Sequence, residues 1–190
     1  MKRLVYIIFI SIFMTSCSGI NEYEQVHENI VRLDSCSYEM EYKVISNKNE
    51  NIYKIKVTAN TKDGYMVEFL EPENMKRIVT RYNEDEAEQE NTTIKDKITI
   101  VDTERFDYNV LMLSNFKKIY MQQDKVEINK LKSGNLNVNL FVPNGNYYFN
   151  KQEIIFDVKD KQPIQMNIYN EDNQKTIEGK IYNVLLEKDI

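Results

Sequence analysis

The chain offers few side chains that could perform catalysis or bind a metal. It contains one histidine, His27, and two cysteines, Cys17 and Cys36. A single histidine cannot supply a multi-histidine zinc site, and two cysteines cannot make a four-thiolate site. A Ser-His-Asp relay would depend on His27 alone. A pair of carboxylates such as Glu71 and Glu73 is no evidence for glycoside hydrolysis, because such pairs are expected among 30 acidic residues. We therefore expect a protein that is not an enzyme and that has no cofactor and no metal.

Nucleotide and nucleic-acid binding are also disfavoured. The five glycines lie far apart, so neither GxGxxG nor GxxxxGK[ST] occurs. The formal net charge is -5, whereas proteins that bind nucleic acids present faces rich in lysine and arginine. With 42% apolar and 29% charged residues in 190, the composition is typical of a globular protein.

The first 16 residues have the layout of a secretory signal: a basic start, Lys2 and Arg3, then a short apolar run that ends in small residues before Cys17. Cysteine directly after Thr15-Ser16 resembles a bacterial lipobox, with Met14 where leucine is usual. We expect a signal peptide at 1–16, a tether at 17–21 that is lipidated on Cys17, and a single domain at 22–190. The alternative is an ordinary signal with a chance cysteine. Cys36 then has no partner in the chain and is expected to be a small buried residue.

The elements that must position any site follow from the apolar periodicity. Residues 23–33 have apolar positions at helical steps after a capping residue, Asn21, and residues 108–122 form a second apolar stripe that Asp107 could cap. Period-two alternation predicts strands elsewhere, with the acidic segment 84–90 as a loop between two of them. The predicted strands are 38–44, 53–59, 65–70, 77–82, 92–101, 126–131, 136–142, 147–149, 154–158, 164–169 and 176–186.

These elements predict an α+β protein that is mostly antiparallel β. Because strands twist, a sheet of this length curls instead of staying flat. A helix with one apolar side would fill the open side of that curl. We expect a curled, unclosed β-barrel plugged by one or two helices.

This order of elements resembles the lipoprotein-carrier superfamily (LolA/LolB-like). The most similar stretch is Gly64–Lys76, GYMVEFLEPENMK, which looks like the family's strand ending in a proline turn; Arg77 stands where the family usually has glycine. An Asn-, Lys- and Ile-rich member with a lipobox is similar to the spore germination lipoproteins of Gram-positive anaerobes. That resemblance implies a non-enzymatic partner that binds and activates a cortex-processing N-acetylmuramoyl-L-alanine amidase, a zinc enzyme. It also implies an extracytoplasmic, lipid-anchored location in the spore envelope.

Two binding modes remain open at the level of the sequence. In the first, the chain carries or senses hydrophobic ligands or lipoprotein acyl chains in an apolar cavity; the same residues could instead simply fill the core. The residues that would line this cavity are Met66, Phe69, Met112, Leu113 and Phe116.

In the second mode, the chain binds a protein partner through aromatic residues at the Pro143-Asn144-Gly145 tip, although these could be ordinary hairpin core. The expected partner-binding residues are Phe141, Tyr147, Tyr148 and Phe149. Open sheet edges would also allow a homodimer by strand exchange. The acidic segment 84–90 could steer a basic partner or be a solvated loop.

The anchor gives the first testable prediction. Mass spectrometry of the protein from native cells is expected to find residues 1–16 removed and acyl chains on Cys17. An uncut leader with an unmodified thiol at position 17 would contradict it.

Overall fold

The structure is a computed structural model that describes residues 21–46, 49–60, 64–83, 86–101, 107–143 and 145–186. It contains eleven antiparallel strands, two α-helices and a short 3-10 helix. The strands are β1 (Cys36–Ile45), β2 (Glu50–Asn60), β3 (Gly64–Glu71), β4 (Ile78–Tyr82), β5 (Glu86–Asn91), β6 (Asp96–Val101), β7 (Glu127–Lys130), β8 (Leu136–Phe141), β9 (Lys151–Phe156), β10 (Pro163–Tyr169) and β11 (Lys175–Leu186). The helices are α2 (Glu22–Val31), η2 (Asp107–Leu111) and α3 (Leu113–Gln122).

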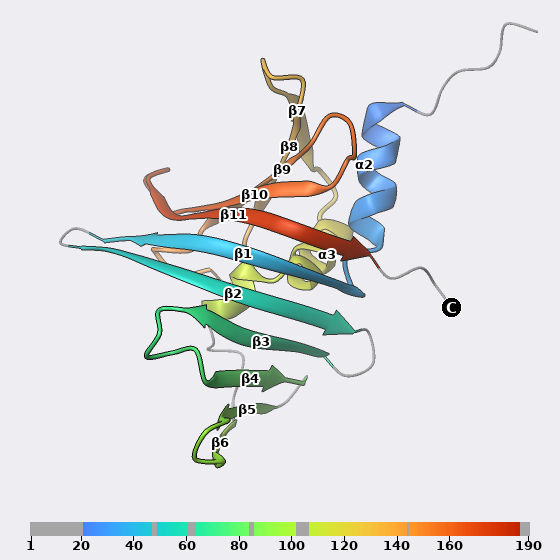
Figure 1. Cartoon of the computed structure of the whole chain (residues 1–190). Coiled ribbons are helices and arrows are strands. Elements are labelled where there is room, and N and C mark those ends of the chain that lie inside the picture. The colour runs from blue at the N-terminus through green and yellow to red at the C-terminus, as the bar shows by residue number, and fades with distance from the viewer. Residues whose placement is uncertain are drawn as a thin grey trace, which may run out of the picture.

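The first and last strands meet at the centre of the sheet. The strand order is β6-β5-β4-β3-β2-β1-β11-β10-β9-β8-β7, and Met40 of β1 pairs with Ile181 of β11. The two meanders, β1–β6 and β7–β11, therefore join through one strand pair, and β6 and β7 are the edges of an unclosed sheet (Figure 1). This architecture is the one that the resemblance to the lipoprotein-carrier superfamily implied, so the expected fold class is confirmed.

Helix α2 begins where the sequence predicted. The side chain of Asn21 accepts a hydrogen bond from the Tyr23 amide at 3.3 Å, which satisfies one of the free N–H groups of the first turn. Val26 and Ile30 are buried, as is Leu33 just beyond the helix, whereas Tyr23 is exposed. Figure 1 shows α2 beside the ends of the central strands. The apolar side of this helix therefore belongs to the core.

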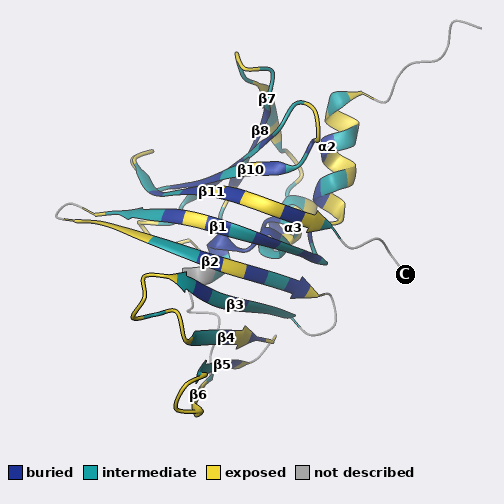
Figure 2. Cartoon of the chain, viewed as in Figure 1, coloured by how far each residue is buried: buried dark blue, intermediate teal, exposed yellow. Residues whose placement is uncertain are grey.

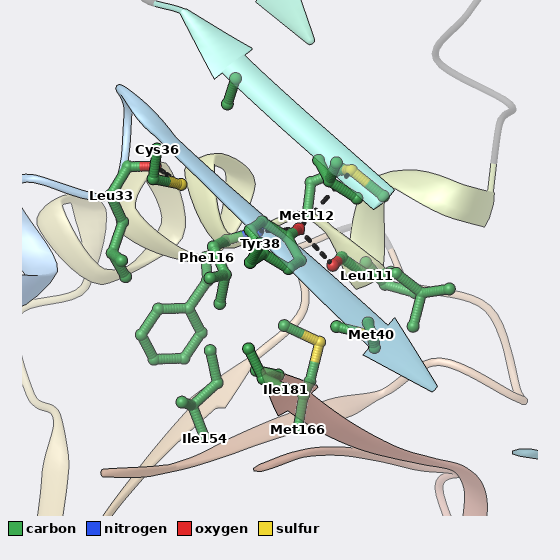
Figure 3. Close-up of a cluster of buried hydrophobic side chains, with 14 of the residues drawn as sticks. Leu33, Cys36, Tyr38, Met40, Leu111, Met112, Phe116, Ile154, Met166 and Ile181 are labelled. Atoms are coloured by element: carbon green, nitrogen blue, oxygen red, sulfur yellow. Dashed lines mark hydrogen bonds between the residues drawn. The ribbon is translucent and has the colours of Figure 1, made fainter. Parts of the chain in front are cut away.

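The core lies between the sheet and α3. Alternate residues of the central strands, such as Tyr38 and Met40 on β1, are buried together with Phe116 of α3 (Figures 2 and 3). The intervening residues of β1 are partly or fully exposed. The sheet thus has one apolar face covered by the helices, as period-two alternation requires.

The segment predicted as one helix over 108–122 is broken at Met112. Met112 has an extended backbone (φ −89, ψ 125) between η2 and α3 and provides no side-chain cap. The buried hydroxyl of Tyr38 supplies the missing contacts: it donates to the Leu111 carbonyl at 3.2 Å (Figure 3). It also accepts from the Leu113 amide at 3.2 Å. Gln152 of β9 also donates to the Val110 carbonyl at 2.8 Å. The sheet therefore fixes the bend between η2 and α3, which together form the helical plug of the curled sheet. Asp107 begins η2 and does not cap α3.

The acidic segment is also different from its prediction. Residues 86–91 form strand β5, not a loop, while Glu84 and Asp85 lie outside the described residues. Glu90 pairs with Arg81 of β4 at 2.9 Å, and Glu88 pairs with Lys97 of β6 at 2.8 Å. Basic residues on both neighbouring strands compensate these carboxylates, so the segment can continue the sheet despite its charge.

The bend in the plug gives a prediction about stability. Tyr38→Phe keeps the ring but leaves the Leu113 amide and the Leu111 carbonyl buried without the hydroxyl. We expect the free energy of unfolding to fall by roughly 1–3 kcal/mol, the usual cost of an unsatisfied buried polar group. Urea denaturation followed by circular dichroism measures this change.

Tyr182→Phe is the matched control, because Tyr182 is exposed on β11. Its free energy of unfolding should change by less than about 0.5 kcal/mol. Equal effects of the two substitutions would contradict the role assigned to the Tyr38 hydroxyl.

Candidate partner-binding site

The predicted aromatic tip is a loop between β8 and β9, which we call the aromatic loop (residues 142–150). Asn144 lies outside the described residues. The loop closes where the Val142 amide donates to the Asn150 carbonyl at 2.9 Å. The Asn146 side chain accepts from the amides of Tyr148 and Phe149 at 2.8 and 3.1 Å. These two amides are thus used inside the loop, which is why Tyr147–Phe149 is not the strand that its three aromatic residues suggested.

The aromatic loop is fixed to the turn between β10 and β11. The Thr176 hydroxyl donates to the Tyr148 carbonyl at 2.9 Å, and the Glu171 amide donates to the Tyr147 carbonyl at 3.1 Å. The Tyr147 hydroxyl also donates to the Asp172 carboxylate. This hydrogen bond raises the pKa of Tyr147, so its hydroxyl stays protonated at neutral pH. Tyr147 and Tyr148 are therefore tied to the neighbouring turn without any partner.

Beside the loop lies a half-open groove of about 760 Å³. One wall comes from the end of β1, one from the aromatic loop, and one from the β10–β11 turn and the start of β11. The groove is lined by Val44, Ile45, Ser46, Tyr147, Tyr148, Phe149, Asn170, Gln174, Lys175, Thr176 and Ile177. A volume of this size is in the usual range for a binding pocket, about 300–1,000 Å³.

The four aromatic residues predicted to bind a partner do not all lie together. Tyr147, Tyr148 and Phe149 line the groove, with the Tyr147 and Tyr148 rings edge to face at 5.2 Å. Tyr148 is 61% exposed and Tyr147 46%, whereas Phe149 packs against the core. Phe141 is 70% exposed at the end of β8, outside the groove, and its carbonyl accepts from the Gln123 side chain at 2.6 Å.

The residues predicted to line an apolar cavity occupy a different region. Met112, Leu113 and Phe116 are fully buried around the bend in the plug, and Phe69 is nearly so. Met66 alternates with the buried Val67 and is on the other face of β3, so it does not join them. The groove described above is lined by other side chains. Binding of an acyl chain by these residues stays a prediction.

Sequence reasoning missed the β1 and β11 walls of the groove. Val44 and Ile177 are register partners across β1 and β11, although 133 positions separate them in the sequence. Alternation could place each residue on an apolar face, but no local pattern states that the first strand pairs with the last.

The cysteines and the histidine have no catalytic arrangement in the described residues. Cys17 lies outside them, and Cys36 is buried with its thiol on the Leu33 carbonyl at 3.2 Å. His27 is on the exposed side of α2, with Nδ1 2.9 Å from the Tyr120 hydroxyl. Over the described ranges, no group of three or more His, Cys, Asp or Glu residues could hold a metal ion. No described helix has both the length and the apolar character needed to cross a bilayer.

Comparison with protein families identifies the family of this chain. Residues 1–189 match the family described as sporulation protein YdcC-like. The chain belongs to this family. No protein with a curated description is significantly similar to this YdcC-like sequence.

Solved structures share the fold of the YdcC-like chain. An uncharacterized conserved protein from Thermus thermophilus is 13% identical, with 90% of each chain covered and a TM-score of 0.51. One chain in the structure of the Clostridioides difficile CwlD amidase in complex with the GerS lipoprotein is 24% identical, covering 88% of this chain and 92% of that chain, with a TM-score of 0.50. A LolA superfamily protein from Nitrosomonas europaea gives 9% identity over 88% and 94% of the two chains and a TM-score of 0.42.

The contacts of the aromatic loop predict how it responds to mutation. Thr176→Val removes the hydroxyl that donates to the Tyr148 carbonyl, whereas Thr176→Ser keeps it. We expect amide hydrogen exchange of the aromatic loop to become about five-fold faster in the valine variant, the equivalent of one lost hydrogen bond. Exchange measured by mass spectrometry should stay near the parent rate in the serine variant. Equal exchange in the two variants would show that the hydroxyl does not hold the loop.

Proposed function

We propose that this YdcC-like chain is a non-enzymatic, lipid-anchored partner that binds and activates a cortex-processing N-acetylmuramoyl-L-alanine amidase. In this role it is required for spore cortex modification and for germination. The family supports a place in sporulation. The fold likeness to a complex of the CwlD amidase and the GerS lipoprotein suggests that this chain corresponds to the lipoprotein of such a pair.

The observation that best supports partner binding is the preorganised aromatic loop. Tyr148 of this loop and Phe141, at the end of β8 just before it, are large apolar side chains that solvent reaches over more than half of their surface. Aromatic residues dominate the energy of many protein interfaces. Hydrogen bonds from Thr176 and Glu171 already order the loop. Binding therefore costs little additional ordering of the backbone.

The proposed location follows from the sequence. Acylation of Cys17 after removal of residues 1–16 would hold the protein on the extracytoplasmic face of a membrane of the developing spore, because two or three acyl chains give a stable anchor. The tether of residues 17–21 would place α2 next to that membrane and leave the domain of residues 22–190 free to bind.

The alternative function is that of an envelope carrier or sensor of hydrophobic ligands. Met112, Leu113 and Phe116 of the plug are buried apolar residues, and the flexible side chain of Met112 could rearrange around an acyl chain. This alternative predicts that lipid co-purifies with the protein, which organic extraction and mass spectrometry would detect.

The two edges of the sheet, β6 and β7, determine where two copies of the chain could pair. Strand β6 ends the sheet with Ile98 exposed and with its charged residues, Asp96 and Lys97, at one end, whereas the other edge, β7, has only four residues and is charged at both ends, Glu127 and Lys130. Charged, short edges resist strand addition. We therefore assign a homodimer by strand exchange, if one forms, to the β6 side.

The experiment that tests the proposed function uses the full chain and the amidase of the same organism. Size-exclusion chromatography should show a stable complex, and hydrolysis of cortex muropeptides by the amidase should be faster in its presence. A double substitution, Phe141→Ala with Tyr148→Ala, should weaken the complex by roughly 30-fold or more, since buried aromatic anchors contribute about 1–3 kcal/mol each.

Tyr23→Ala is the matched control, because Tyr23 is an exposed aromatic residue on α2, outside the groove and the aromatic loop. It should leave affinity unchanged. Absence of a complex together with unchanged amidase activity would reject the proposed function and leave the carrier alternative.

A further inference from the structure

The polar side chains that line the groove beside the aromatic loop are mostly used within the protein. The side-chain amide of Asn170 donates to the side-chain oxygen of Gln174 at 3.3 Å, and its oxygen accepts from the Gln174 backbone amide at 2.8 Å. The Ser46 hydroxyl donates to the Asn49 carbonyl at 2.8 Å, and the Thr176 hydroxyl is used by the aromatic loop. A molecule that enters the groove therefore meets few groups that need a hydrogen bond.

The apolar part of the groove is continuous with the core. Ile177 of β11 is buried, and its register partner Val44 of β1 packs against the core, as does Phe149 of the aromatic loop. Figure 1 shows the β1–β2 hairpin and the β10–β11 turn at the same end of the sheet. An occupant of the groove would therefore gain stability by burying an apolar side chain against these residues.

Two carboxylates stand at the rim of the groove, beside the tyrosines. Glu171 and Asp172 are exposed in the β10–β11 turn. The Tyr147 hydroxyl donates to the Asp172 carboxylate, and the Glu171 amide donates to the Tyr147 carbonyl. The hydrogen bond to Asp172, and to a smaller extent the charge of Glu171, raise the pKa of Tyr147. Both carboxylates therefore lie close to the Tyr147 ring.

The positive charge of the groove is compensated, but the negative charge at its rim is not. Lys175, the basic residue of the lining, forms an ion pair with Glu178 at 3.1 Å. Lys48, in the β1–β2 turn, lies outside the described residues. Within the described part of the chain neither rim carboxylate forms an ion pair, in contrast to the carboxylates of β5. The tyrosine end of the groove therefore favours a cation.

Exposed tyrosine rings beside uncompensated carboxylates suit a guanidinium group. This group is planar, so it can stack on an aromatic face while its N–H groups donate to carboxylates. Tyr148 is exposed over more than half of its surface, and its ring is edge to face with that of Tyr147 at 5.2 Å. An anionic group would be repelled by Glu171 and Asp172. The groove thus combines an apolar surface with a site for one cationic, planar group.

We propose that the groove binds a segment of the partner amidase in which an arginine is next to an apolar residue. The arginine stacks on Tyr148 and pairs with Glu171 and Asp172. The apolar residue covers Val44 and Ile177. This inference rests on the proposed function for the identity of the partner, but the recognition chemistry is a property of this chain alone and can be measured without the amidase.

The test is a titration of the full chain in micelles of a neutral detergent, followed by nitrogen-edited NMR. The probe is N-acetyl-leucyl-arginine amide, and the control probe has citrulline, which is neutral and of nearly the same shape, in place of arginine. The arginine dipeptide should give saturable shifts at millimolar concentration for the backbone amides of Tyr148, Glu171 and Asp172. The citrulline dipeptide should bind about five-fold more weakly, because it lacks the cation–π contact and the ion pairs.

A double variant and a matched control test the role of the two carboxylates. Glu171→Gln with Asp172→Asn removes both charges but keeps an acceptor for the Tyr147 hydroxyl, and the preference for arginine should fall to about two-fold, the part that the ring contributes. Glu24→Gln removes an exposed carboxylate on α2, outside the groove, and should retain the preference of the parent. In the complex with the amidase, the double variant should weaken binding about five-fold and Glu24→Gln should not.

The possible outcomes separate this inference from the proposed function. Absence of saturable shifts, equal binding of the two dipeptides, or a preference that the double variant retains in full would overturn the inference. An amidase complex that forms as proposed but tolerates the double variant as well as Glu24→Gln would also overturn it. A preference for arginine that depends on the carboxylates, without any complex with the amidase, would reject the proposed function alone.

Discussion

The hydroxyl group of Tyr38 lies between two backbone groups that would otherwise be buried without partners. It comes from the strand that stands at the centre of the sheet, and it satisfies the end of η2 and the start of α3 at once. A continuous helix would need no such contact. One side-chain oxygen therefore sets the direction of the plug relative to the strands. The packing of the apolar core and the position of α3 depend on that direction.

The groove beside the aromatic loop lies where the regular part of the sheet ends. It is formed where β1 ends beside the β10–β11 turn. An irregular segment supplies its exposed aromatic side chains, and a hairpin positions that segment, because the Thr176 hydroxyl donates to the Tyr148 carbonyl. This division is common in proteins, because a packed sheet supplies rigidity and the segments at its ends supply chemistry. The groove requires no reactive side chain.

Local patterns in the sequence were sufficient for most of the fold. Alternation along residues 38–44 located β1 and its apolar face, and Asn21 marked the start of α2 correctly. The failures have one physical cause, which is that distant groups decided the local structure. The apolar stripe at 108–122 predicts one continuous helix, because the Tyr38 hydroxyl that stabilises the break is more than 70 residues away in the sequence. Tyr147–Phe149 has strand propensity, but the Asn146 side chain takes two of its amides. Carboxylates at 86–90 suggest a solvated loop until Arg81 and Lys97 are known to flank them.

The central position of the last strand has a consequence for how the molecule is made. Synthesis proceeds from the N-terminus, so β1 to β6 exist before β11 can pair with β1. During that interval one side of β1 presents unpaired N–H and C=O groups along a strand of ten residues, an open template for association with other chains. A nascent chain of this kind exposes that edge until the twelve residues of β11, Lys175–Leu186, have been synthesised. Loss of β11 would remove the strand that joins the two meanders, β1–β6 and β7–β11.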